Sequence, residues 1–549
     1  MRQLLLIQNS KDKYLQIKQG IINAYSDPEL AKKQLFPLIA AISTIVLWVA
    51  LIIKLMGKPT FPIINDIPLL HYMSQQILEG QVPYKDFYDH NLPGAYLIHL
   101  IALIFFGKSD EAWTIFTFIW MAYTAVIVGI YCWRISRLSA FLTPALIACS
   151  TLFMDTFSFG QRDQLIVLFL ILASHLFANV LENPDITPPY SKAKQLFACG
   201  LALSFATFIK PTPIVLLGLF FIILFVKDFR NYRSNMLGSS LLDKRTTIKH
   251  FLIQYFSLAL GSILPPLIFG FWLSLTGALL PFLEIMQKFN GVIYSSIERV
   301  ELPVLFRLMM AEFWPLSVNL IFIVIGLFAI RESKYLTRIM IALLLLVFGA
   351  FHYILQGKGW DHHLVPFSIF VLILQGIFCG MLFKKGLVFN VMGMVWLLLT
   401  VSIYIIQMNI YVVIPEKVLL DRKPAVPLLV QDLNDLGISE EDRIQVMDRA
   451  EGGLHVLFLL QHRQATPYLY DFTLIDAADD LYMKELQDDF NDRLVLDPPK
   501  WIVFFNNGGL PKTTGISRLN ADPRLLTFLN SDYHSVKVRE FYTIYEHNP

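Results

Sequence analysis

Ionisable side chains that could support a group transfer collect in short polar stretches between long apolar ones. A carboxylate can act as a general base and take the proton of a hydroxyl group. Lysine, arginine and histidine side chains can hold a phosphate while it leaves. The residues concerned are Asp66; Lys85, Asp86, Asp89 and His90; Arg162 and Asp163; and Lys210 together with Lys358, Asp361, His362 and His363. They can act together only if they lie on one side of the elements that carry them.

The composition indicates an integral membrane protein. The chain has 549 residues, of which 55% are apolar and only 16% are charged, and its mean hydropathy is +0.54. Average soluble proteins carry about 25% charged residues. The net charge is +2, and the basic residues form short clusters between apolar runs, which argues against binding of nucleic acid.

Apolar stretches long enough to cross a hydrocarbon core of about 30 Å predict about eleven transmembrane helices. Basic residues lie at the alternate ends of these stretches, which by the positive-inside rule places the N-terminus in the cytoplasm and the C-terminal part outside. The expected spans are residues 35–55, 112–133, 138–153, 163–181, 194–208, 214–226, 251–275, 316–330, 339–355, 364–383 and 388–414.

Two further apolar segments, residues 68–79 and 93–107, are predicted to be helices that lie in the membrane interface. At about 1.5 Å per residue the second reaches only about 21 Å, which is too short for a crossing. A crossing there would also place Arg134 and Arg137 outside the cell, against the positive-inside rule. Both helices therefore belong to a long first external loop, residues 56–111.

The predicted fold is a polytopic α-helical membrane protein with a soluble α/β domain at its C-terminus. Residues 1–34 form a cytoplasmic segment, residues 35–414 the transmembrane domain, and residues 415–549 an external, periplasmic domain. In that last domain the pattern predicts strands at 443–447, 501–505, 536–540 and 543–546 and helices at 453–461 and 482–489.

In this topology the candidate residues all face the exterior, and ionisable groups held at the ends of spans are costly enough to suggest a function. A base beside phosphate-binding cations suits glycosyl transfer from a lipid-phosphate donor, because nucleotide sugars are cytoplasmic. A transporter or lipid flippase would use the same charges as a pathway, with broken helices at the midplane. A polysaccharide polymerase or ligase would rely on a different loop.

The order of several short motifs resembles that of the GT-C glycosyltransferases, in particular the bacterial members of the protein-mannosyltransferase and aminoarabinose-transferase clan. The similar segments cover most of the chain. They are Asp66, GQVPYKDFYDHNLPG at residues 80–94, GQRD at 160–163, Lys210 with Pro211, and QGKGW at 356–360 followed by His362.

The resemblance implies an inverting transfer from a polyprenyl-phosphate sugar in a bacterial inner membrane, with the acceptor a glycan, a lipid or a protein. Asp66 matches the catalytic base, and Asp89 matches a second catalytic acid that positions the acceptor or the base. One departure is Ile67, where protein mannosyltransferases carry a second acid, so a glycan or lipid acceptor is favoured over a protein. The expected substrate-binding residues are Lys85, Asp86, His90, Arg162, Asp163, Lys210, Lys358 and His362.

No metal or other cofactor is expected. Asp66, Asp89 and Asp163 could supply oxygen ligands to a divalent cation, and some members of the wider superfamily use one. Lys85 and Arg162, however, balance two of these carboxylates without a metal. The four cysteines all lie in apolar segments, where free cysteines are usually buried.

Overall fold

The computed structural model describes most of the chain. The described residues are 28–57, 60–64, 66–152, 154–182, 189–235, 241–297, 299–313, 318–329, 335–382, 387–411, 425–439, 441–448, 452–469, 471, 474, 480–505 and 522–549. The predicted segment 1–34 lies largely outside them, as does the expected boundary at residue 415.

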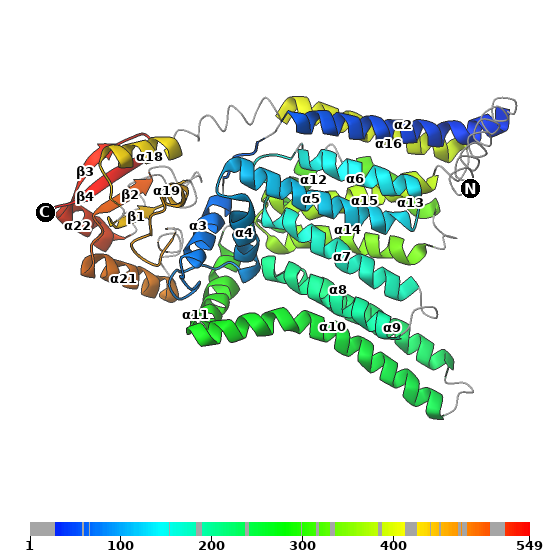
Figure 1. Ribbon diagram of the computed structural model, residues 1–549, viewed down its shortest axis with the longest axis horizontal. Coiled ribbons are helices and arrows are strands. Elements are labelled where there is room, and N and C mark those ends of the chain that lie inside the picture. The colour runs from blue at the N-terminus through cyan, green and yellow to red at the C-terminus, as the bar shows by residue number, and fades with distance from the viewer. Residues whose placement is uncertain are drawn as a thin grey trace, which may run out of the picture.

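Long helices run side by side along one direction, and a small sheet lies beyond one end of them (Figure 1). The helices before residue 300 are α2 (Pro28–Met56), α3 (Asp66–Leu78), α4 (Pro93–Phe106), α5 (Asp110–Trp133), α6 (Arg137–Leu152), α7 (Arg162–Glu182), α8 (Pro189–Ile209), α9 (Ile214–Asn235), α10 (Leu241–Thr276), α11 (Leu279–Glu284) and the π-helix η1 (Ile285–Tyr294). Those that follow in this part are α12 (Leu302–Phe313), α13 (Val318–Ala329), α14 (Leu336–Gln356), the 3-10 turn η2 (Asp361–Leu364), α15 (Val365–Leu382) and α16 (Leu387–Tyr411).

These helices make the chain a polytopic membrane protein. Among the described residues, five helical segments are long and apolar enough to cross a bilayer: Asp110–Trp133, Arg162–Glu182, Lys249–Thr276, Leu336–Gln356 and Asp361–Leu382. Large apolar side chains such as Phe271 (67% exposed) and Val347 (64% exposed) cover the outside of the bundle. Contact with lipid hydrocarbon explains why they stand outward, since water would make such a surface costly.

Both segments expected in the interface form short helices. Helix α3 begins at Asp66, with Pro68 in its first turn, and α4 begins at Pro93 and ends at Phe106, so it has only 14 residues. Proline fits the first turn of a helix because its missing N–H has no partner there in any case. Figure 1 shows the two helices together at the end of the bundle that faces the sheet.

Some boundaries differ from the prediction. Helix α2 begins at Pro28, before the apolar run that starts at residue 35. Residues 276–314, expected as a loop, contain α11, η1 and α12. Their apolar residues recur at helical spacing on one side only, a pattern that a search for continuous apolar runs overlooks.

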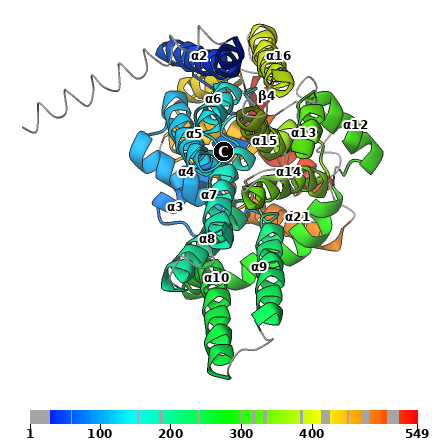
Figure 2. The same cartoon turned by 90° about the vertical axis from the view of Figure 1, so that its right-hand side faces the viewer.

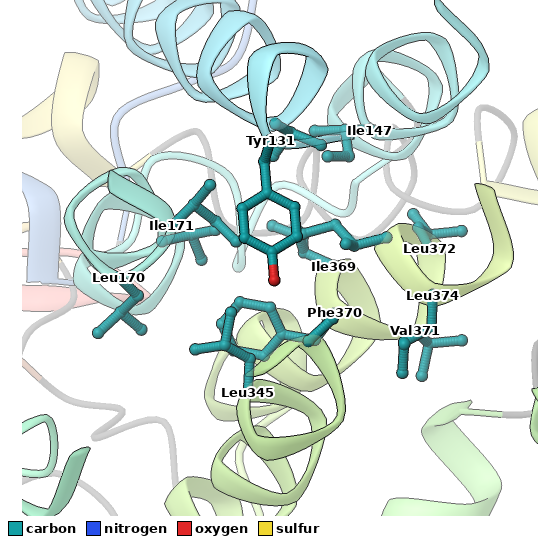
Figure 3. Packing of buried hydrophobic residues seen from close by; sticks show 14 of the residues in the cluster. Tyr131, Ile147, Leu170, Ile171, Leu345, Ile369, Phe370, Val371, Leu372 and Leu374 are labelled. Atoms are coloured by element: carbon teal, nitrogen blue, oxygen red, sulfur yellow. The ribbon is translucent and has the colours of Figure 1, made fainter. Parts of the chain in front are cut away.

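The centre of the bundle is packed with apolar side chains from α5, α6, α7, α14 and α15 (Figure 3). In Figure 3 the ring of Tyr131 lies among residues that include Leu170, Leu345 and Phe370. The Tyr131 hydroxyl donates to the backbone oxygen of Arg338 at 2.5 Å, because a buried hydroxyl group needs a partner. Helix α15 is the most enclosed of the candidate spans, and it packs against α6, α7, α13, α14 and α16 (Figure 2).

The C-terminal part forms a four-stranded sheet in the order β1-β2-β4-β3. β1 and β2 are parallel and fully buried, whereas β4 is antiparallel to both β2 and β3. Continuous apolar runs such as that of residues 501–505 suit strands covered on both faces. The elements are α18 (Ala425–Asp435), β1 (Ile444–Met447), α19 (Gly453–Leu460), α21 (Leu481–Leu496), β2 (Trp501–Phe505), α22 (Pro523–Asp532), β3 (Tyr533–Val538) and β4 (Tyr542–His547).

Helices α8 and α10 approach closely through two glycines. A Cβ atom on Gly200 would lie 2.3 Å from the backbone oxygen of Leu258, and one on Gly261 would lie 2.1 Å from that of Phe197. Small residues commonly allow such backbone contact between membrane helices. On the same α10, a Cβ atom on Gly270 would meet nothing within 4 Å.

We therefore expect Gly261→Ala to destabilise the protein by about 1–3 kcal/mol, the usual cost of overpacking. Thermal unfolding of the purified protein in detergent measures the effect as a lower midpoint. Gly270→Ala is the matched control and should leave the midpoint unchanged or raise it. Equal midpoints for the two variants would contradict the close packing of α8 and α10.

Candidate active site

The predicted polar residues gather where several helices begin or end at one end of the bundle. Asp66 is the first residue of α3, and Arg162 and Asp163 are the first two of α7. Lys210 follows the last residue of α8, and His362 lies in η2 before α15. An acid in the first turn of a helix is favoured by the helix dipole, which explains the positions of Asp66 and Asp163.

Arg162 connects two parts of the first external loop. One guanidinium nitrogen, Nη2, lies 2.7 Å from Oδ2 of Asp66. The other, Nη1, donates to Oδ1 of Asn91. A planar guanidinium can serve two acceptors in fixed directions, which an ammonium group does less well. The start of α7 therefore sets the positions of Asp66 and Asn91 relative to each other.

Asp89 is fully buried and is hydrogen-bonded to Asn91. Its carboxylate accepts hydrogen bonds from the backbone N of Asn91 at 3.1 Å, from Nδ2 of Asn91 at 3.0 Å and from the Tyr96 hydroxyl. These hydrogen bonds fix the side-chain amide of Asn91, whose oxygen accepts a hydrogen bond from Arg162. The chain of contacts runs Asp89, Asn91, Arg162, Asp66, so Asp89 is placed to position the candidate base.

A second buried cluster lies beside the first. Oδ2 of Asp163 is 3.2 Å from Nζ of Lys210, and its Oδ1 is 2.7 Å from Nε2 of His352. Nδ1 of His352 is 2.6 Å from the Thr212 hydroxyl, and Nζ of Lys210 is 3.5 Å from Nε2 of His363. Charges buried in this way are stable only when they are paired and hydrogen-bonded. The contacts therefore hold the Lys210 ammonium group in place.

The charges of the two clusters influence one another. Burial acts to raise the pKa of Asp66, but the positive charge of Arg162 and the nearby His362 and Lys210 outweigh it, and the pKa lies below its ordinary value. Burial lowers the pKa of Lys210, although Asp163 opposes the shift. Burial also lowers the pKa of His90 to about 4, so His90 is neutral at pH 7.

His90 and Lys358 meet the candidate site through η1. Lys358 donates to the backbone oxygens of Tyr294, at 2.8 Å, and Ile297, and its Nζ lies 4.5 Å from the centre of the Tyr294 ring. The centre of the His90 ring is 4.6 Å from that of the Tyr294 ring. The backbone oxygen of His90 accepts a hydrogen bond from Nδ2 of Asn290 at 2.8 Å. A π-helix is uncommon and often marks a functional region.

Lys85 and Asp86 lie apart from these clusters. Both are exposed. Lys85 donates to the backbone oxygen of Thr276 at 3.0 Å, at the C-terminal end of α10, where a cation is favoured. Asp86 accepts from the backbone N of Val82 at 2.7 Å within a turn. Their predicted part in substrate binding stays a prediction, and the geometry gives each a local structural role.

Three of the residues could hold a metal ion. Asp163, His362 and His363 each offer a ligand atom, and these atoms lie within 4.8 Å of one another, a donor set that suits a transition metal such as zinc. The Lys210 ammonium group lies 3.2 Å from Asp163, so a positive charge is already supplied there. A cation at this place would compete with Lys210.

Sequence reasoning missed several participants. His352 lies within α14, in a candidate span, and Thr212 lies in the turn after Lys210. An ionisable residue inside a span is a signal in its own right, so His352 could have been noted. Asn91 and Tyr96 carry no charge and gave no comparable signal.

The C-terminal part contacts the first external loop directly. The backbone N of Tyr88 donates to the oxygen of Pro467 at 2.8 Å, and the backbone N of Gln464 donates to the Tyr72 hydroxyl at 2.7 Å. Arg463 pairs with Glu79 at 3.2 Å on the surface. The segment that holds Asp89 and Asn91 is therefore supported from both sides, by the bundle and by the sheet domain.

Comparison with known proteins supports this description. Residues 89–242 match the family model described as dolichyl-phosphate-mannose-protein mannosyltransferase, a segment that includes Asp89, Arg162, Asp163 and Lys210. The fold is similar to that of ArnT from Cupriavidus metallidurans bound to undecaprenyl phosphate, with a TM-score of 0.57 and 12% identity over 92% of this chain and 97% of that one.

The same ArnT in its apo state matches with a TM-score of 0.39, 12% identity and coverage of 92% and 98%. No curated protein sequence matches the chain. The family match over residues 89–242 and the shared fold support the expected resemblance to the GT-C glycosyltransferases.

Proposed function

We propose that the protein transfers a sugar from a polyprenyl-phosphate donor to an acceptor hydroxyl group, with inversion at the anomeric carbon. The observation that carries the proposal is the pairing of Asp66 with Arg162 at 2.7 Å, beside the buried Lys210. This arrangement sets a carboxylate next to cations suited to a phosphate. ArnT, whose fold is similar, was crystallised with undecaprenyl phosphate.

In the proposed reaction the acceptor oxygen bonds to the anomeric carbon while the bond from that carbon to the phosphate oxygen breaks. The phosphate leaves with the electron pair, and the acceptor proton passes to Asp66. Arg162, Lys210 and His362 face the growing charge on the phosphate, which is most effective where charges are already in place. Lys358 contacts the end of η1 through the backbone oxygens of Tyr294 and Ile297, and we propose that it contributes to donor binding from there.

Arg162 links donor binding to the strength of the base. In the structure its charge lowers the pKa of Asp66, which makes the carboxylate a weak base. A donor phosphate competes with Asp66 for the same guanidinium group. When Arg162 turns to the phosphate, the pKa of Asp66 rises and the carboxylate becomes a better base.

The expected acceptor is a cell-envelope glycan or a lipid, because Ile67 replaces the second acid of protein mannosyltransferases. The sheet domain contributes to the choice of acceptor, since its residues 463–468 contact the loop that positions Asp66. Asp163, His362 and His363 need no metal ion, because the Lys210 ammonium group neutralises Asp163.

We further propose the topology expected from the sequence: eleven spans within residues 35–414, a cytoplasmic segment 1–34, and residues 415–549 on the periplasmic side of a bacterial inner membrane.

The described cysteines are all buried, so Ser535→Cys adds an exposed thiol in β3. An impermeant maleimide should label this variant in spheroplasts. Labelling only after lysis would show that the C-terminal part lies in the cytoplasm and would contradict the proposed topology.

Asp66→Asn should abolish sugar transfer, by at least about a thousandfold, and keep donor binding. The amide cannot accept the proton, whereas Arg162 and Lys210 still bind phosphate. Purified protein in nanodiscs is supplied with a set of polyprenyl-phosphate sugars and envelope acceptors, and release of polyprenyl phosphate is followed. Native mass spectrometry with undecaprenyl phosphate measures binding.

Glu111→Gln is the control for this experiment, because Glu111 is an exposed carboxylate at the start of α5. It should behave as the wild type. Incubation with EDTA should also leave transfer unchanged. Turnover that survives in Asp66→Asn rules out Asp66 as the base, and activity lost to EDTA and restored by a divalent ion rules out the metal-free site.

The pH profile tests the role of Arg162. Because Arg162 helps to keep the pKa of Asp66 below its ordinary value, Asp66 stays ionised as the pH falls, and the acid limb of kcat/KM lies below the usual range of an aspartate. Removing this charge in Arg162→Gln raises the pKa, so the acid limb of the residual activity should move to higher pH. Arg307→Gln, an exposed arginine of α12, should leave the limb in place.

A further inference from the structure

A groove on the outside of the bundle is unrelated to the site described above. It has a volume of about 640 Å³, within the range of small-molecule sites, about 300–1,000 Å³. Its walls are α2 and α5, and its floor is α6. Helix α2 packs against α6 and α16, and Figure 2 shows α2 and α16 along one edge of the bundle.

The groove exists because small side chains leave the space empty. On α5 its lining includes Ala122, Ala125 and Gly129, and on α6 it includes Ala140 and Ala148. A Cβ atom on Gly129 would lie 3.1 Å from the backbone oxygen of Ala140, so α5 and α6 approach closely beneath it. The groove therefore forms because α5 and α6 pack closely at its floor, while the small side chains that line it leave the space over that floor unfilled.

The remaining lining is hydrocarbon that faces the membrane. Trp48 and Ile52 of α2, Val126 of α5 and Phe141 of α6 line it, and Val126 and Phe141 are each 57% exposed. Inside a bilayer no water is present to fill such a space. The occupant must therefore be a hydrocarbon chain.

One end of the groove is basic. Arg134, which directly follows α5, lines it, and Arg137, the first residue of α6, lies over the Trp133 ring at 5.8 Å. Both arginines are exposed, and no ion pair between them and another part of the described chain is present. The nearby carboxylate of Glu182 is paired with Arg338 at 2.8 Å. A negatively charged headgroup is a natural partner for these two guanidinium groups, because neither forms an ion pair within the described residues.

The sugar donor does not fit this place. Asp110 lies at the end of α5 that is far from Arg134. Its carboxylate accepts a hydrogen bond from the backbone N of Ile63, in the segment that leads to Asp66. Helix α5 has 24 residues, which at about 1.5 Å each separate Arg134 from that end by about 36 Å. A donor with its phosphate at Arg134 could not present its sugar to Asp66.

We propose that the groove binds an acidic phospholipid of the inner leaflet, on the side of the membrane opposite to the candidate active site. Its acyl chain lies between α2 and α5, and its phosphate lies on Arg134 and Arg137. The lipid fills the gap between α2 and α5 and so holds α2 against the bundle. Residues 60–64, which follow α2, are already tied to α5 through Thr114 and Asp110. The choice of leaflet rests on the topology proposed above, whereas the site itself does not depend on the proposed sugar transfer.

Native mass spectrometry of the full-length protein in detergent tests this proposal by titration with phosphatidylglycerol and with phosphatidylethanolamine of the same chains. Wild type should bind phosphatidylglycerol more tightly. Arg134→Gln and Arg137→Gln should each weaken that binding about fivefold, the usual contribution of one basic residue at a lipid surface. Arg230→Gln, an exposed arginine of α9, is the control and should have no effect.

Ala122→Trp fills the groove and should remove the tightest bound lipid, whereas Ile115→Trp, on an exposed part of α5 outside the groove, should not. If Ala122→Trp fails to fold, the arginine variants decide. Equal affinity for the two lipids, or unchanged binding in both arginine variants, would overturn the proposal. Competition between undecaprenyl phosphate and phosphatidylglycerol for this groove would overturn it as well.

Discussion

The guanidinium group of Arg162 holds together parts of the molecule that the chain supplies separately. It pairs with Asp66 of α3 and with Asn91 of the following loop, while Arg162 itself begins α7. Such a group is stable at a membrane boundary only when its partners are fixed. The burial of Asp89, the interfacial helices and the packing of the loop can all be understood as means of fixing them.

The adjoining network of Asp163, Lys210 and His352 extends the same principle into the bundle. It joins α7, the end of α8 and α14, and every member is buried. Because one carboxylate neutralises the nearby ammonium group, the site can keep a cation ready without a large cost in stability. Asp163 and Lys210 stand at helix ends, where backbone groups can share their hydrogen bonds, whereas His352 reaches them from within α14.

The sequence was sufficient for features that depend on length and spacing. The apolar runs predicted most helices to within a few residues, and Pro68, Pro93 and the short run after residue 93 predicted the two helices α3 and α4. Motif order brought Asp66, Arg162, Asp163, Lys210 and His362 into one set, and the structure places these residues close together.

Pairing across the fold could not be obtained in this way. Nothing in the spacing shows that His352, far along the chain, would meet Asp163, or that Lys85 would turn to the end of α10. The position of η1 could not be predicted either, because its apolar residues lie on one side of the helix only and the segments it contacts lie elsewhere in the sequence. Charges predict candidates for a site, but their partners are determined by tertiary packing.

The contacts between the sheet domain and the first external loop have a consequence for biosynthesis. Tyr72 and Tyr88 receive their partners from residues 464 and 467, which the ribosome adds after every helix of the bundle. The helices can enter the membrane one after another, but the loop around Asp89 remains without this support until the last quarter of the chain has been made. The end of the molecule that carries the candidate site is therefore completed last, so a partly made chain in the membrane does not yet hold the finished site.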